Sequence, residues 1–595
     1  MKILSLHCDY IKFKPLKKAI KDSQELSEEQ KKEVEVKDPL GIFVAVEKSD
    51  EGNLKKIIDN LVLNIIDLKD KIGKIETIVL YPYAHLSSNL SSPQFALNVL
   101  EATEEILKQK KIKVFRAPFG YYKEFELKCK GHPLSELSRE IKLEVDVVEQ
   151  TTQEIKTKKD EIDSDEVSEE ERSKLVKRAG KITMQASRGN NDLKSNVELG
   201  KELDLYIVNE VVGQGLPLFT PKGATIKREI ERFTTDEELK RGYEYTATPF
   251  MAKADLYKIS GHWQHYRDGM FTLKDGDETL ALRPMTCPFQ FILFKRKSRS
   301  YRDLPKKYGE ISTLFRKEQS GELRGLTRVR QFTLADAHII CTAEQVEEEF
   351  GKVIDLINYV MEKLGIKDVT YRFSKWDPEN KENKYANNPK AWESTQIIMK
   401  KILDHLKINY VEAEGEAAFY GPKLDIQYKD VYGKEDTLIT VQIDFALPER
   451  FDLTYKDDKG MDQRPTIIHR SSSGATERVI AYLLEKTQGN LPTWLSPIQV
   501  KVLSFTDRNE KTAQKVLDEL KEEGVRAEAD FTSTTVNDKV RNAALMKIPY
   551  IITIGDKEEE KDTIALKRRG ANKPEFGVKL ANFLKEIKNE IKERK

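Results

Sequence analysis

Three side chains suited to binding a metal ion stand far apart in this sequence of 595 residues: Cys287, His338 and His469. Cysteine and histidine are preferred ligands of Zn²⁺, and three protein ligands leave a fourth position open for a substrate. Asp336 precedes His338 by two residues in a segment with strand character. Alternation predicts that both side chains point to the same side of that strand. Spacing alone does not argue for a metal, since buried cysteines and hydrogen-bonded histidines are common.

Arginines and a carboxylate recur in the segment LFRKEQSGELRGLTRVRQF, residues 314–332. Arg316 and Glu318 lie at strand spacing, a loop with two glycines follows, and the chain returns with Arg328. This pattern predicts a hairpin that presents cations on one face, and guanidinium groups suit phosphate oxygens. The alternative is a surface strand pair with solvated charges. Downstream, SSSGATERVIAYLLEK places Arg478 four residues after Gly474, at the start of an apolar helix.

The elements that must position these residues fall into three folded regions and a linker, which predicts a multidomain α+β protein. Residues 1–145 combine strand and helix patterns in a compact α/β domain, and residues 146–189 form a linker that is charged and almost wholly polar. Residues 190–492 contain helices and many strands without regular β-α-β alternation, which favours an antiparallel sheet flanked by helices. Residues 493–595 return to alternation and predict a small α/β domain.

Composition narrows the function less than the motifs do. The 101 basic and 100 acidic side chains nearly cancel, so net charge argues neither for nor against a nucleic-acid partner. Four widely separated cysteines suggest no disulfide framework and fit a reducing cytoplasm. The sequence shows neither a signal-peptide pattern at its N-terminus nor a membrane span, so we expect a cytoplasmic protein without a membrane partner.

Three segments resemble the motifs of class II aminoacyl-tRNA synthetases. They are GLPLFTPKGATIKREIERF with GYEYTATPF ending at Pro249, the run Phe315-Arg316-Lys317-Glu318, and Gly474 to Arg478. In that class the first segment, a helix and a proline-ended strand, builds the interface of a homodimer, and the other two bind ATP. The resemblance implies that Arg316 contacts the α-phosphate, and that Arg328 and Arg478 hold the terminal phosphates with Mg²⁺. It also implies that Glu318 lies near the adenine amino group and that Phe332 stacks on the adenine.

Within that class, MTCP, DAHII and IIHR resemble the threonyl-tRNA synthetases. The resemblance implies that Cys287, His338 and His469 bind one zinc ion in the catalytic domain, which chelates the amino and hydroxyl groups of threonine. A hydroxyl requirement is useful because an apolar pocket separates threonine poorly from its near-isostere valine. The resemblance also places three residues around the threonine: Asp336, Tyr420 and Gln442. His262 and His265 also look like metal ligands, but their family counterparts are not, so we expect packing or hydrogen bonding.

The N-terminal region resembles the archaeal type of threonyl-tRNA synthetase editing domain, which is related to D-aminoacyl-tRNA deacylases. The segments that carry this likeness are YPYAHLSS, APFGYYKEF and GHPLSELSR. An editing step is expected, because serine also carries a hydroxyl and one methyl group is worth only about 1–3 kcal/mol. The editing residues implied by the resemblance are His85, Tyr122, Lys123 and Glu136. The alternative is that these are surface charges and a loop histidine.

The C-terminal region resembles the class II anticodon-binding domain in VLSFTDRN, KIPYIITIGDKEEE and LKRRG. The resemblance implies that Glu558, Arg568 and Arg569 meet the anticodon. Leu566 stands where many members carry arginine, a departure from the family pattern. The chain as a whole is therefore expected to be a threonine–tRNA ligase with threonine tRNA, ATP and L-threonine as partners. Two alternatives remain: a synthetase of the same class for proline or serine, and a non-catalytic RNA-binding paralogue that regulates translation.

Overall fold

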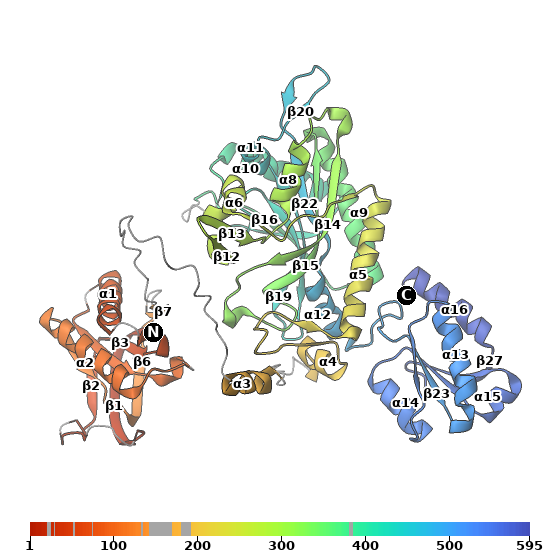
Figure 1. Cartoon of the computed structure of the whole chain (residues 1–595). Coiled ribbons are helices and arrows are strands. Elements are labelled where there is room, and N and C mark those ends of the chain that lie inside the picture. Colours follow the sequence, from red (N-terminus) through yellow and green to blue (C-terminus); the bar gives the residue numbers. More distant parts are fainter. Residues whose placement is uncertain are drawn as a thin grey trace, which may run out of the picture. The chain divides into compact units, whose positions relative to one another are not determined.

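The computed structural model describes residues 1–20, 25–28, 30–51, 54–73, 75–87, 89–131, 135–141, 169–179, 192–379 and 385–595. The chain divides into two compact units, Met1–Ser164 and Asp165–Lys595. Of the predicted linker, 146–189, the described part is the helix α3 (Glu169–Ala179), shown with the other elements in Figure 1. None of the described helices combines the length and the apolar character needed to cross a bilayer.

The first unit is a seven-stranded sheet covered by two helices. Its strands are β1 (Lys2–Lys18), β2 (Val34–Lys37), β3 (Pro39–Ala45), β4 (Thr77–Pro82), β5 (Lys113–Arg116), β6 (Tyr121–Cys129) and β7 (Glu136–Glu140). The order is β2-β1-β3-β4-β5, and β6 and β7 also pair with β1. Helices α1 (Leu54–Ile72) and α2 (Pro93–Gln109) bury leucine, isoleucine and valine side chains against the sheet. Their apolar positions recur with the helical period, as the sequence predicted.

The second unit is built on an eight-stranded sheet in the order β10-β14-β15-β22-β19-β18-β16-β17. These strands are β10 (Glu244–Tyr245), β14 (Lys306–Phe315), β15 (Gln331–Cys341), β16 (Thr370–Ser374), β17 (Tyr410–Ala413), β18 (Lys423–Lys429), β19 (Glu435–Asp444) and β22 (Thr466–Ala475). All neighbouring pairs are antiparallel except β10 with β14 and β16 with β17. The predicted fold class, a largely antiparallel core flanked by helices, is confirmed.

Helices cover both faces of this sheet (Figure 1). They are α4 (Asn196–Glu202), α5 (Pro221–Lys240), α6 (Ala254–Ser260), α7 (His262–His265), α8 (Cys287–Lys295), α9 (Val346–Leu364), α10 (Pro389–His405), α11 (Leu447–Arg450) and α12 (Thr476–Thr487). On one face α5, α9 and α12 share a core with Ala337, Ile339 and Ile468 of the sheet. On the opposite face α8 packs with Ile340 and Ile467. Residues of β15 and β22 thus alternate between the core shared with α5, α9 and α12 and the opposite face, which carries the site.

Short strands complete this part of the unit. They are β8 (Tyr206–Ile207), β9 (Leu218–Phe219), β11 (Met251–Lys253), β12 (Thr272–Asp275), β13 (Glu278–Leu282), β20 (Tyr455–Lys456) and β21 (Asp462–Gln463). The strand predicted to end at Pro249 is shorter than expected, because β10 ends at Tyr245. Beyond it, the backbone N–H of Thr246 donates to the carbonyl oxygen of Gly309 at 2.8 Å, and the hydroxyl groups of Thr246 and Thr248 bind the Glu310 carboxylate.

The C-terminal part of the second unit has a five-stranded sheet in the order β24-β23-β25-β26-β27. Its strands are β23 (Val500–Ser504), β24 (Ala527–Asp530), β25 (Tyr550–Ile554), β26 (Ile564–Arg568) and β27 (Glu575–Val578). Its helices are α13 (Glu510–Glu522), α14 (Val536–Leu545), α15 (Asp556–Lys561) and α16 (Leu580–Glu593). The first three strands in this order run parallel, which confirms the predicted α/β character.

A buried ion pair ties the central sheet to α5. The Arg470 guanidinium on β22 lies 2.6 Å from the Glu238 carboxylate on α5, and neither side chain is exposed. The Ser472 hydroxyl donates a second hydrogen bond to the same carboxylate oxygen, at 2.5 Å. Burying one such charge without the other is costly, so the pair fixes how the helix sits on the sheet.

Replacement of Glu238 by alanine should destabilise this unit strongly. Arg470 would be left as a buried charge without its counter-ion, which costs about 3–5 kcal/mol. Denaturant unfolding of the full chain measures the loss, with Glu347→Ala as the control. Glu347 is 60% exposed and pairs with the exposed His405, so that variant should unfold like the parent. Equal effects of the two substitutions would contradict the prediction.

Candidate active site and metal centre

The three predicted metal ligands meet on the face of the central sheet that α8 covers. Cys287 begins α8, and His338 on β15 is the direct cross-strand partner of His469 on β22. Their ligand atoms all lie within 4.8 Å of one another. Each residue is at most 5% exposed. One thiol and two imidazoles at this separation form a donor set that suits Zn²⁺.

The outward ring nitrogens of both histidines are already bound, which orients the rings. The Nδ1 of His338 lies 2.6 Å from the side-chain oxygen of Gln290, so this nitrogen carries the proton. The Nε2 of His469 lies 2.7 Å from the Asp444 carboxylate, whose other oxygen accepts backbone hydrogen bonds from 446 and 447. The remaining nitrogens are left available toward Cys287. Such second-layer bonds are typical of histidines that bind a metal.

The residues expected around threonine lie beside this triad. Asp336 is 7% exposed, and its carboxylate is 4.0 Å from the Nε2 of His338. Burial raises the pKa of the Asp336 carboxyl above its usual value. The Tyr420 ring stacks on His469 with centroids 4.9 Å apart, and its hydroxyl donates a 2.7 Å hydrogen bond to Gln442. These groups offer polar contacts in a small, buried space.

The side chains predicted to bind ATP lie in the neighbouring part of the site. The Arg316 guanidinium lies 5.1 Å from the centre of the Phe332 ring, and the Nε of Arg328 is 2.9 Å from the Glu318 carboxylate. The Nε of Arg478 donates a 3.0 Å hydrogen bond to the carbonyl oxygen of Thr327. These arginines are thus held before any ligand is bound.

Gly474 positions Arg478 at the end of β22. Its φ is +85°, and a Cβ atom there would come within 2.1 Å of the Leu438 carbonyl oxygen. Glycine is therefore required where β22 passes β19 and the chain turns into α12. This explains the glycine-to-arginine spacing of the sequence motif.

All eleven catalytic-domain residues predicted from the sequence line one cavity of about 310 Å³. They are Cys287, Arg316, Glu318, Arg328, Phe332, Asp336, His338, Tyr420, Gln442, His469 and Arg478. Sequence reasoning missed Lys423 and Thr440, which line the same cavity. Thr440 precedes Gln442 by two residues and Lys423 is paired with Gln442 across two strands, so alternation and pairing offered a signal. His262 and His265 pack against Phe419, and His262 also bonds the Ser260 hydroxyl.

The predicted editing residues of the first unit lie on three elements: Tyr122 and Lys123 on β6, His85 in a short 3₁₀ helix and Glu136 on β7. Lys123 is partly buried, and its ammonium donates to the carbonyl oxygens of 118 and 121, each at 2.9 Å. It lies 5.2 Å from the Tyr81 ring, and His85, in the short 3₁₀ helix Ala84–Leu86, contacts the adjacent Tyr83. Tyr122 is 56% exposed, and Glu136 at the start of β7 is also exposed. His85 and Lys123 thus flank one group of aromatic rings.

The predicted anticodon residues differ in what their side chains contact. Glu558 lies in α15, and its carboxylate accepts a hydrogen bond from the backbone of Gly555 at 3.2 Å. Arg568 forms ion pairs with Glu575 and Glu586, and Arg569 donates to the backbone carbonyl oxygens of 491 and 547. Both arginines therefore have partners within the chain.

Comparison with known proteins agrees with this geometry. Residues 270–487 match the family described as "tRNA synthetase class II core domain (G, H, P, S and T)", and residues 499–590 match "Anticodon binding domain". The fold and the site thus define a class II aminoacyl-tRNA synthetase core. Residues 1–141 match "Archaea-specific editing domain of threonyl-tRNA synthetase".

Individual relatives specify the family. A threonine–tRNA ligase of Clostridium botulinum is 57% identical over 398 residues, which are 66% of this chain and 62% of the relative. A crystal structure titled RNA binding domain of threonyl-tRNA synthetase, from Cryptosporidium parvum, is 33% identical with a TM-score of 0.63, covering 67% of this chain and 98% of that one. A putative threonyl-tRNA synthetase of Aeropyrum pernix is 27% identical with a TM-score of 0.59, covering 67% and 97%. The chain belongs to the threonyl-tRNA synthetase family, and it spans 62% of the length of that first curated relative.

The amine of Lys123 should titrate at an unusually low pH. Burial disfavours its charged form and lowers its pKa from 10.5 to about 8. Because only the neutral amine is nucleophilic, labelling by acetic anhydride should rise through pH 8. Mass spectrometry of the labelled full chain measures the profile, with the exposed Lys128 of the same strand as the internal reference. Identical profiles for the two lysines would contradict the prediction.

Proposed function

We propose that this chain attaches threonine to its tRNA in an ATP-dependent reaction through a threonyl-adenylate, and hydrolyses serine attached by mistake. The observation that carries the proposal is one cavity whose lining includes a cysteine, two histidines and the three arginines predicted to bind ATP. The cysteine and the two histidines suit a metal that selects a hydroxyl, and the arginines suit a nucleoside triphosphate. Neither proline nor an RNA ligand alone calls for that combination.

In this proposal Cys287, His338 and His469 hold one Zn²⁺ per subunit. The ion, when bound, supplies a Lewis-acid position for the amino and hydroxyl groups of threonine. Asp336 accepts a hydrogen bond from the substrate hydroxyl, since it lies beside His338 on the same face of β15. Valine offers no hydroxyl to either partner, and a site built around such a group rejects the isostere strongly.

The arginines act on the nucleotide. Arg316, stacked on Phe332, is placed to hold the α-phosphate, where negative charge develops during adenylate formation. Arg328 and Arg478 hold the terminal phosphates, together with Mg²⁺. Glu318 and Phe332 receive the adenine. The threonine carboxylate attacks the α-phosphate in line, so catalysis consists of orientation and charge stabilisation without a protein nucleophile.

The first unit supplies the correction step. Serine retains the hydroxyl and differs by one methyl group, which is worth about 1–3 kcal/mol and is too little for accurate translation. His85, Tyr122, Lys123 and Glu136 are proposed to bind the seryl end of the tRNA. Lys123 supports this role because burial brings its pKa to about 8, within reach of neutral pH.

The proposal includes a homodimer in the cytoplasm. Phe250, Met251 and Leu273 are exposed by 41–55% on and beside the β11–β13–β12 sheet, near the segment that builds the dimer interface in class II enzymes. All four cysteines are free thiols, which suits a reducing compartment. The C-terminal sheet, with Glu558, Arg568 and Arg569, is proposed to bind the anticodon of threonine tRNA.

Loss of Cys287 should remove both zinc and threonine activation. In Cys287→Ala we expect bound zinc below a tenth of the parent and threonine-dependent ATP–pyrophosphate exchange reduced by about 100-fold or more. Elemental analysis and the exchange assay, run with threonine, valine, serine and proline, measure both. Cys341→Ala is the matched control, because Cys341 is equally buried on β15 but lies outside the triad. A zinc-free parent enzyme with full activity, or a preference for proline, would overturn the proposal.

Replacement of Lys123 by alanine should separate editing from charging. Hydrolysis of preformed seryl-tRNA should fall by about tenfold or more, while threonylation stays within about twofold of the parent. Lys128→Ala, on the same strand, should leave both rates unchanged. The editing assignment fails if the Lys123 variant hydrolyses seryl-tRNA as fast as the parent, with no other deacylase present.

A further inference from the structure

A tight turn carries Arg328 to the edge of the cavity. The backbone N–H of Arg324 donates to the carbonyl oxygen of Arg328 at 3.1 Å, and the reverse bond is 3.2 Å. Gly325 adopts a φ of +49° inside this turn. Since the turn closes on Arg328 itself, the position of the turn sets the position of this arginine.

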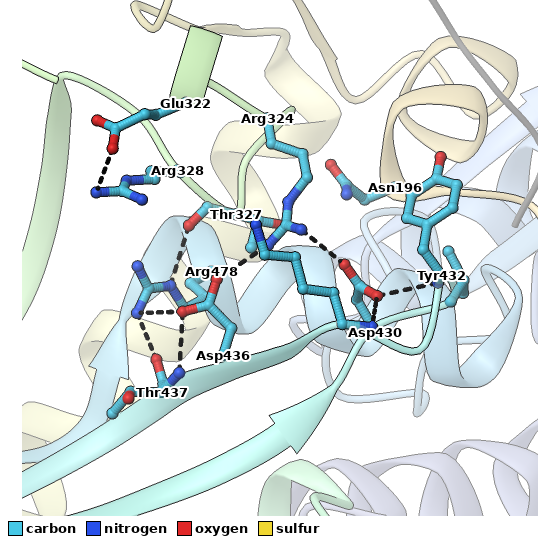
Figure 2. Close-up of polar contacts among 12 residues, drawn as sticks. Asn196, Glu322, Arg324, Thr327, Arg328, Asp430, Tyr432, Asp436, Thr437 and Arg478 are labelled. Atoms are coloured by element: carbon cyan, nitrogen blue, oxygen red, sulfur yellow. Dashed lines mark hydrogen bonds and ion pairs between the residues drawn. The ribbon is translucent and has the colours of Figure 1, made fainter. Parts of the chain in front are cut away.

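The side chain of Arg324 fastens the turn to the β18–β19 hairpin. Its two terminal nitrogens lie 3.0 Å from Asp430 and 3.0 Å from Asp436, as Figure 2 shows. Asp430 is a rigid anchor, because its side chain is 3% exposed and its other oxygen accepts the backbone N–H groups of Tyr432 and Lys434. Asp436 is 23% exposed and lies nearer the cavity.

Asp436 also faces the second phosphate-binding arginine. Its other oxygen lies 3.7 Å from Arg478, which donates to the backbone carbonyl oxygens of Thr327 and Thr437 (Figure 2). One carboxylate thus stands between guanidinium groups from two elements, the turn and α12. Without it, Arg324 and Arg478 would repel each other across the gap, Arg324 would lose a partly buried hydrogen-bond acceptor, and Arg478 would lose its ion-pair partner.

We propose that Asp436 is a positioning residue that holds the turn bearing Arg328 and the head of Arg478 at the spacing required by the terminal phosphates of ATP. This inference rests on the proposed function, since it assumes that these arginines bind a triphosphate. Asp436 acts through the arginines and need not touch the nucleotide. Its loss should weaken the contacts with the β- and γ-phosphates and leave the adenosine and α-phosphate contacts of Phe332 and Arg316 as they were.

The test compares the binding of ATP and AMP by titration calorimetry in the full-length chain. Asp436→Asn keeps the size of the side chain and removes its charge, and we expect the Kd for Mg·ATP to rise by about tenfold while that for AMP stays within about twofold. Asp436→Glu should recover part of the loss. In Arg324→Gln, the further effect of Asp436→Asn should be smaller than in the parent, because the two side chains act as one unit.

Asp462→Asn is the matched control, since Asp462 pairs with Lys456 on an exposed hairpin of the same unit. It should bind both nucleotides like the parent. Equal weakening of ATP and AMP in Asp436→Asn would show a general loss of structure and overturn the inference, as would unchanged ATP binding. The exchange assay is run separately on the parent: failure there overturns the proposed function, whereas the ratio of ATP to AMP affinities tests Asp436 alone.

Discussion

The register between β15 and β22 is the constraint on which the site depends. It sets Asp336 opposite Ser471 and His338 opposite His469. Because side chains alternate between the faces of a sheet, a slip of β22 by one residue against β15 would turn His469 into the core shared with α5, α9 and α12, away from His338. The apolar residues between them prevent such a slip, since Ala337, Ile339 and Ile468 fill that core. The packing of one face therefore determines the chemistry of the other.

The cavity combines two electrostatic environments within one sheet. At the metal-binding end, burial raises the pKa of the Cys287 thiol and of the Asp336 carboxyl, and it lowers the pKa of His338. Neutral groups are thereby favoured, which fits the proposal that a bound metal ion would complete the charge of the site. At the other end, Arg328 and Arg478 are partly exposed and already have oxygen partners. Anionic phosphates fit that end because the cations are oriented in advance.

Sequence patterns predicted much of the fold and the main residues of the cavity, because residue types and their spacing can be read directly from the sequence. The helix periods of α1 and α2 and the antiparallel character of the core were readable in this way. The role of Asp436 could not be predicted in this way, because it depends on a contact between β19 and a turn more than a hundred residues earlier in the chain. The strand predicted to end at Pro249 ends at Tyr245, and beyond it the hydroxyl groups of Thr246 and Thr248 bind the Glu310 carboxylate, a contact that the sequence does not reveal. The partners of Arg568 and Arg569 within the chain could not be read from the sequence either, because they come from packing; the role of both arginines at the anticodon stays a prediction.

A site that selects a hydroxyl would explain why the first unit, Met1–Ser164, belongs in the same chain and has a different chemistry. In the proposed function, the groups around His338 and Asp336 would distinguish threonine from valine by a polar contact that valine cannot make. The same contact would accept serine, and a site of this kind would reject serine only through the missing methyl group, a difference of about 1–3 kcal/mol. No rearrangement of Asp336, Tyr420 or Gln442 removes that limit, because a smaller substrate always fits. Under this proposal, discrimination against serine would follow attachment, and the partly buried Lys123 lies in a unit that has its own sheet and core.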